Sequence, residues 1–171
     1  MRKVLLAFSI AAISFGSANA QDAGTGFHFA GGLRVALPIG DFADVSGFGI
    51  GAELQGENMF SETFSGLVSV GYTNYSGKDY EVPGYGTIEG SSMGMIPIMA
   101  GVRFYPSTSF FVGAKAGVSI GTASGAGSNF TYEPQIGLNG EKFQVSLGYN
   151  AISGSGATLS SIGLSALYKF N

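Results

Sequence analysis

Apolar residues recur at every second position in eight separate segments of this chain, and this period of two constrains its fold more than any other feature. Alternation of this kind predicts β-strands with one apolar face and one small or polar face. In the last segment, the face opposite the apolar residues carries Gly163, Ser165, Leu167 and Lys169. Its apolar face consists of Ile162, Leu164, Ala166, Tyr168 and Phe170.

The number and length of these segments predict a closed barrel. Most have close to the 9–11 residues that a tilted strand needs to cross a bilayer, and after the first twenty residues no apolar run is long enough for a spanning helix. An apolar chain without spanning helices can pair all its backbone N–H and C=O groups inside a membrane if its strands form a closed barrel. We therefore expect an all-β fold, an eight-stranded antiparallel up-and-down transmembrane β-barrel. Its expected strands are 27–37, 48–55, 64–75, 93–104, 110–120, 130–138, 143–150 and 162–170.

The N-terminal residues have the pattern of a cleaved secretory signal. Arg2 and Lys3 supply the positive region, residues 4–15 the apolar region, and Ala18-Asn19-Ala20 a cleavage site. We expect residues 1–20 to be a signal peptide and residues 21–171 to form one outer-membrane barrel domain.

Composition agrees with a membrane barrel and excludes several other classes. Charged residues make up 11% of the chain, against about 25% in ordinary globular domains. The chain has no cysteine, which excludes a lipid-modified cysteine, disulfides and thiolate metal sites. Without Arg2 and Lys3 the net charge is 6 − 11 = −5, so we expect no nucleic-acid partner.

The lengths of the connections predict which end of the barrel faces outward. Four segments, 38–47, 76–92, 122–129 and 151–158, alternate with mostly shorter ones at 57–63, 105–109 and 139–142, the last containing the hairpin signal Asn139-Gly140. Bacterial barrels have short periplasmic turns and longer extracellular loops. We therefore place both termini in the periplasm, and the aromatic residues then gather near both ends of the strands.

Several loose motifs in the mature chain resemble the OmpX/OmpW-like and Bacteroidetes-type outer-membrane β-barrel families. They are Leu37-Pro38-Ile39-Gly40-Asp41-Phe42 followed by Gly47-Phe48-Gly49-Ile50-Gly51, Ile96-Pro97-Ile98 followed by Gly101-Val102-Arg103-Phe104-Tyr105, and the final Tyr168-Lys169-Phe170. The resemblance implies that Tyr168 and Phe170 belong to a terminal signal read by the barrel-assembly machinery.

Charged residues on the inner face are the candidate site of the barrel. By alternation they are Arg34, Glu53, Arg103, Lys115, Glu133 and Lys169, with Glu57 near the rim. The bore of an eight-stranded barrel is narrow enough for side chains to fill, and buried charges need partners. We expect a salt-bridge network that plugs the lumen, and the alternative is a gate in which Arg34, Glu53, Lys115 and Glu133 exchange partners.

Other features give weaker hypotheses. The single histidine, His28, is expected on the inner face at the periplasmic rim, without the serine motif that a catalytic triad would need, so we expect no enzyme. We expect no metal and no cofactor. The loop 76–92 could form a surface patch for recognition, with Lys78, Asp79, Tyr80 and Tyr85 as contact candidates.

The function expected from these features is a structural or surface-interaction role in the cell envelope. A narrow channel or conduit for small apolar solutes is the alternative, and an enzyme that modifies lipid A is a third, less favoured class. The expected partners are outer-membrane lipid, lipopolysaccharide and, during insertion, the barrel-assembly machinery, and the expected state is a monomer.

Overall fold

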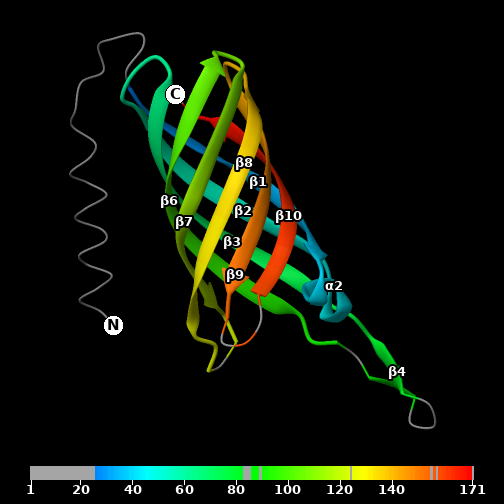
Figure 1. The fold of residues 1–171 in the computed structure, drawn as a ribbon. Coiled ribbons are helices and arrows are strands. Elements are labelled where there is room, and N and C mark those ends of the chain that lie inside the picture. The colour runs from blue at the N-terminus through cyan, green and yellow to red at the C-terminus, as the bar shows by residue number, and fades with distance from the viewer. Residues whose placement is uncertain are drawn as a thin grey trace.

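Eight long antiparallel strands close into a barrel in the computed structural model, which describes residues 26–82, 86–88, 90–123, 125–154, 156 and 158–170. The order around the barrel is β1-β10-β9-β8-β7-β6-β3-β2, so each strand pairs with its neighbours in the chain (Figure 1). This confirms the predicted eight-stranded antiparallel up-and-down fold. The predicted signal peptide, residues 1–20, lies outside the described residues. The barrel strands are β1 (Phe27–Ile39), β2 (Ser46–Met59), β3 (Phe64–Gly77), β6 (Met93–Ser107), β7 (Phe110–Gly121), β8 (Ser128–Asn139), β9 (Phe143–Ser153) and β10 (Thr158–Lys169).

The first and last strands close the barrel. β1 pairs with β10 in one continuous register, from Ala30 opposite Lys169 to Ile39 opposite Ser160. Closure leaves no free edge in the main sheet, which is how a β-structure avoids unpaired backbone groups in an apolar medium.

The alternation read from the sequence places the apolar side chains outside. Leu33 is 72% exposed and Leu138 63% exposed, whereas their neighbours Arg34 and Gly137 are buried. The interior carries most of the buried polar residues instead, which reverses the usual distribution of a soluble protein. The expected outward positions Val68, Val70 and Tyr72 of β3 are exposed as well.

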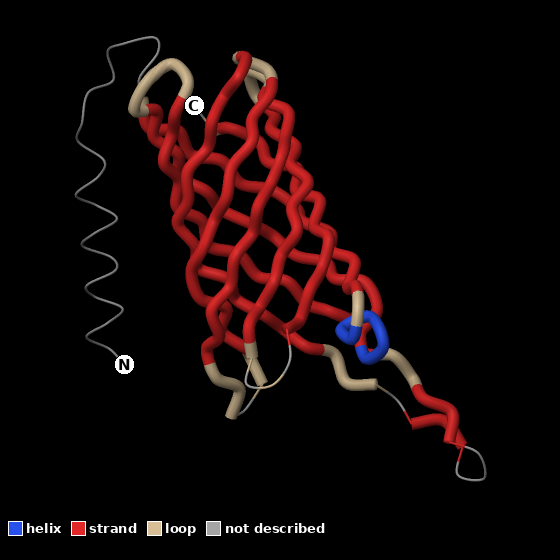
Figure 2. Tube along the Cα trace, viewed as in Figure 1, coloured by secondary structure: helices blue, strands red, loops and turns tan. Residues whose placement is uncertain are grey.

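The two ends of the barrel differ. At one end, called here the turn end, residues 60–63, 108–109 and 140–142 connect the strands, and the chain leaves β10 there (Figure 1). At the other, the loop end, lie a short helix and a small hairpin that projects beyond the barrel (Figure 2). The helix is α2 (Asp41–Val45), and the hairpin pairs β4 (Tyr80–Val82) with β5 (Gly86–Ile88).

The connection expected at 38–47 is shorter and more ordered than predicted. β1 runs on to Ile39, β2 begins at Ser46, and α2 occupies most of the remaining residues. No periodic signal marks so short a helix, and it has no side-chain N-cap; Phe42, which it buries, holds it against the barrel.

The part of the chain that the structure describes contains no membrane-spanning helix.

Candidate functional site in the filled lumen

Four of the predicted lumen charges meet at one level of the bore. Arg34 Nη2 lies 2.5 Å from Glu133 Oε2, and Lys115 Nζ lies 2.7 Å from Glu53 Oε1. Two longer pairs close the group: Lys115 Nζ is 3.1 Å from Glu133 Oε1, and Arg34 Nη1 is 3.6 Å from Glu53 Oε2. We call these four residues the central cluster. Two positive and two negative groups make it neutral.

The barrel's curvature brings the central cluster together. Lys115 and Glu133 are register partners on β7 and β8, whereas Arg34 on β1 reaches Glu133 across the bore. All four residues are buried. Because an isolated buried ion is costly and a paired one can be tolerated, these residues stabilise the interior only as a set.

Two glycines make room for the pair that crosses the bore. A Cβ atom at Gly148 on β9 would lie 2.8 Å from Glu133 Cγ, and one at Gly163 on β10 would overlap the Arg34 guanidinium. Both positions face inward by alternation, so a larger side chain there would compete with the ion pair for the same space.

A second polar group, the turn-end cluster, surrounds the fully buried Arg103. Its guanidinium lies 2.7 Å from Glu57 Oε2 and 4.2 Å from the centroid of the Phe111 ring, a cation–π contact. It also donates to the side-chain oxygens of three glutamines, while the hydroxyls of Ser65 and Tyr105 donate to Glu57. The three glutamine acceptors are Gln55 at 2.9 Å, Gln135 at 3.3 Å and Gln144 at 2.8 Å.

The period of two along β2, β8 and β9 puts these glutamines on the inner face, but an uncharged polar side chain gives no sequence signal of the partner it will bond. Three buried side-chain atoms have no hydrogen-bond partner among the described residues: Arg103 Nε, Gln135 Nε2 and Ser119 Oγ.

The remaining predicted lumen charge, Lys169, lies outside both clusters. It is half-buried at the turn end, where its Nζ donates to Asn139 Oδ1 at 2.5 Å and to the Gly140 carbonyl at 2.9 Å. This amine therefore braces the hairpin turn between β8 and β9. His28 is exposed at the same end of the barrel.

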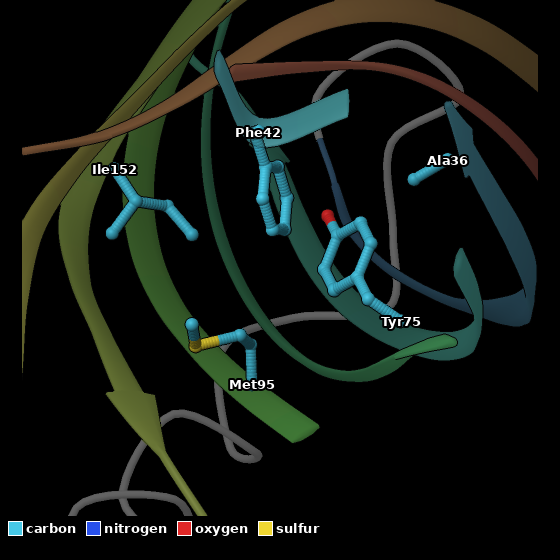
Figure 3. Close-up of a cluster of buried hydrophobic side chains, with 5 residues drawn as sticks. All are labelled: Ala36, Phe42, Tyr75, Met95 and Ile152. Atoms are coloured by element: carbon cyan, nitrogen blue, oxygen red, sulfur yellow. The ribbon is translucent and has the colours of Figure 1, made fainter. Parts of the chain in front are cut away.

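An apolar layer lies in the bore on the loop-end side of the central cluster, and we call it the loop-end plug. Its buried side chains are Ala36, Phe42, Tyr75, Met95 and Ile152 (Figure 3). Phe42 comes from α2 and is 1% exposed, and its ring stacks edge-on against Tyr75 with centroids 4.9 Å apart. Sequence reasoning missed this layer, because Phe42 lies in a connection where no strand period applies.

Two of the four predicted loop contacts, Lys78 and Asp79, form hydrogen bonds within the chain. Lys78 Nζ donates to the Ala43 carbonyl of α2 at 2.5 Å, and the Asp79 carboxylate accepts the Gly90 N–H at 3.0 Å. Tyr80 begins β4, and Tyr85 lies outside the described residues.

The aromatic residues of the predicted assembly signal face outward at the turn end. Tyr168 is 40% exposed and Phe170 61% exposed, and Tyr168 packs edge-on against Phe143 with centroids 5.2 Å apart. Further aromatic contacts lie near the same end, including Phe64 with Phe104, while Tyr132 contacts Phe130 and Tyr149 near the loop end.

The chemistry available to this interior is ion pairing and hydrogen bonding. The described residues contain no group of three or more His, Cys, Asp or Glu side chains that could hold a metal ion. What the lumen residues do together is fill the bore in three successive layers: the loop-end plug, the central cluster and the turn-end cluster.

Comparisons with known proteins agree with this architecture. The chain is similar to the crystal structure of Ail, the attachment invasion locus protein of Yersinia pestis, with a TM-score of 0.59 and 14% identity over 84% of this chain and 97% of that one. It is also similar to the N-terminal β-barrel domain of Pseudomonas aeruginosa OprF, with a TM-score of 0.51 and 12% identity over 84% of this chain and 97% of that one. A de novo designed transmembrane β-barrel matches with a TM-score of 0.51 and 15% identity over 87% of this chain and 98% of that one. Neither a protein-family model nor a curated protein sequence matches the chain.

Proposed function

We propose that this chain is an integral outer-membrane protein with a structural or surface-interaction role in the cell envelope, built on a barrel whose lumen is closed by side chains. One observation carries the proposal: large apolar side chains cover the outside of the barrel on every strand, while the paired charges lie inside. A soluble barrel would have the opposite arrangement.

The outer surface has the pattern that lipid requires. Leu33, Leu54 and Leu164 are among the exposed residues at the middle of their strands, whereas exposed aromatic residues gather nearer the two ends. Apolar centres flanked by aromatic girdles are typical of outer-membrane barrels. An exposed apolar surface of this extent would drive aggregation in water.

The proposed orientation follows the length of the connections. The loop end, with α2 and the β4–β5 hairpin, faces the exterior and meets lipopolysaccharide and other surfaces, and the turn end faces the periplasm. Tyr168 and Phe170, exposed at the turn end, are the residues that the barrel-assembly machinery would read, and we propose that the inserted protein is a monomer. The name of Ail, an attachment and invasion protein, supports a role at the cell surface for a barrel of this fold.

Cell fractionation combined with gel electrophoresis tests the membrane assignment. We expect the protein in the outer-membrane fraction, and we expect its unheated form to migrate differently from the boiled form, because a closed barrel resists unfolding by detergent. Recovery in the soluble periplasmic fraction would overturn the proposal.

Planar-bilayer recordings separate the plugged barrel from a narrow channel. We expect no steady conductance from the wild-type protein, since three layers of side chains cross the bore. A control variant, Leu138→Ala, removes an outward side chain and should behave in the same way. The gate would be supported instead if the wild-type protein conducts and if charge reversal of Arg34 or Glu133 changes that conductance.

We propose no enzymatic activity. His28 is the single histidine of the chain, and it lies exposed at the turn end. Mass spectrometry of lipid A from cells with and without the protein should show no difference, and a new lipid A species would contradict this view.

A further inference from the structure

A small cavity lies in the lumen between the central cluster and the loop-end plug. Its volume is about 20 Å³, and its wall includes residues of both groups: Arg34, Glu53 and Glu133 from the first, and Tyr75, Met95 and Ile152 from the second. Hydroxyl and amide side chains line the space between them. These are Ser69, Thr73, Ser119 and Asn150.

Ser119 is the residue in this wall whose bonding is incomplete. It is 1% exposed, and its Oγ has no hydrogen-bond partner among the described residues. A buried hydroxyl left without a partner is unfavourable, because it has lost its hydrogen bonds to water. The geometry thus joins a small cavity, whose wall carries both apolar and polar side chains, with a buried hydroxyl that needs a partner there.

The neighbouring ladder is also interrupted at this height. β3 and β6 pair at Val70 and Ile98 and again at Thr73 and Met95, but no bridge joins Gly71 to Pro97 between them. Proline has no N–H to donate to a ladder. Both residues line the cavity, and Pro97 is also the register partner of Ser119.

The dimensions and the charges of the cavity select its ligand. A buried water molecule needs roughly 10–15 Å³ of such space and two to four polar partners. The cavity provides that space for one molecule, and its wall provides the partners. A cation is disfavoured, because Arg34 and Lys115 already neutralise the two carboxylates.

We propose that one water molecule is bound in this cavity, hydrogen-bonded to Ser119 Oγ and to the polar side chains that surround it. The central cluster is then a unit of four charged side chains and a bound water. The loop-end plug lies between the cavity and the loop end, and the two polar clusters lie between the cavity and the turn end. The water therefore exchanges slowly with bulk solvent.

Two variants of nearly equal volume test the site. Ser119→Thr keeps the hydroxyl, whereas Ser119→Val replaces it with a methyl group. In ¹⁵N-labelled protein in detergent micelles, we expect a nuclear Overhauser contact between a long-lived water and the Ser119 amide in the wild type. The contact should persist in Ser119→Thr and vanish in Ser119→Val.

Heat-modifiable gel mobility shows whether each variant still forms the barrel, and the whole test is independent of the proposed envelope role because it is made in micelles. Absence of the water contact in the folded wild-type protein, or its persistence in folded Ser119→Val, would overturn the proposal.

The path by which the bound water exchanges with bulk solvent gives a second test. Phe42→Ala should shorten the lifetime of the bound water by tenfold or more, because it opens the loop-end plug. Phe111→Ala removes an equally buried ring at the turn end and should leave that lifetime nearly unchanged. A larger effect from Phe111→Ala would show that the cavity is not closed at the loop end as proposed.

Discussion

At the scale of single residues, the interior is organised by mutual neutralisation. Each charged residue of the central cluster lies within 4 Å of two opposite charges, and each cluster is neutral by itself. Removing one partner of a buried pair leaves the other as an uncompensated ion, which is more harmful than removing both. The stability of the charged interior thus depends on equal numbers of positive and negative groups as well as on individual contacts.

Glu133→Gln tests this balance. It leaves Arg34 and Lys115 facing one carboxylate, so we expect the free energy of unfolding to fall by about 3 kcal/mol or more. Urea unfolding in phospholipid vesicles, followed by far-ultraviolet circular dichroism because the chain has no tryptophan, measures the change.

The matched control is Glu62→Gln, which removes the same charge from an exposed turn and should have little effect. Adding Arg34→Met to Glu133→Gln restores neutrality and should recover part of the loss. Equal effects of the two Glu→Gln changes would contradict the importance of pairing.

At the scale of elements, α2 contributes to the barrel interior through one buried side chain. The helix is five residues long and has no side-chain N-cap, yet it buries Phe42 in the mouth of the barrel. Lys78 holds the helix from outside. Its side-chain amine donates to the Ala43 carbonyl, and its backbone N–H donates to the Val45 carbonyl at 3.2 Å. A short helix gains its stability from such tertiary contacts rather than from its own propensity.

Phe42→Ala should lower the free energy of unfolding by about 3 kcal/mol, the usual range for loss of a buried phenylalanine ring. Phe60→Ala, at the opposite end, removes a ring that is 66% exposed and should have a smaller effect. The same urea titration measures both, and equal losses would mean that Phe42 does not form part of a packed layer.

Lys78→Met should loosen α2 without unfolding the barrel. The side chain is exposed and its bond to Ala43 lies at the loop end, so we expect faster amide exchange in residues 41–45 and unchanged exchange in the barrel strands. Hydrogen–deuterium exchange with mass spectrometry checks this. Unchanged exchange in residues 41–45 would show that Phe42 alone holds the helix.

At the scale of the whole molecule, an apolar surface and a charged interior specify a lipid environment. In the sequence, the segments 40–47 and 76–92 contain five acidic residues and one lysine, a net charge of −4. The connecting segments 122–127 and 154–157 contain no charged residue. The proposed extracellular face is therefore acidic.

Leu33→Arg places a charge on the proposed lipid face near the middle of β1, where Leu33 is 72% exposed. We expect a loss of about 2–4 kcal/mol of unfolding free energy in vesicles. Val45→Arg, exposed on α2 at the loop end, should lose about 1 kcal/mol or less, because it lies outside the apolar band. An unchanged free energy of unfolding in Leu33→Arg would contradict membrane insertion.

An acidic loop end also predicts what the protein does not bind. At low salt and neutral pH, the protein in neutral detergent should pass through a heparin column without retention, because like charges repel. The same preparation should bind an anion exchanger. Retention on heparin would show that the charge balance of the loops does not govern recognition.

The sequence by itself determined the strand number, the faces of the strands and the identity of the inward charges, because each depends on a local period of two. The same period puts Gln55, Gln135 and Gln144 on the inner face. Only the tertiary structure decided which of these side chains meet: Arg34 reaches Glu133 across the bore, whereas Lys169 bonds to a turn. The curvature and closure of the barrel set those partners, and Phe42 became part of the lumen only because α2 folds over its mouth. Contacts across a bore join residues distant in the chain, and a local repeat carries no information about them.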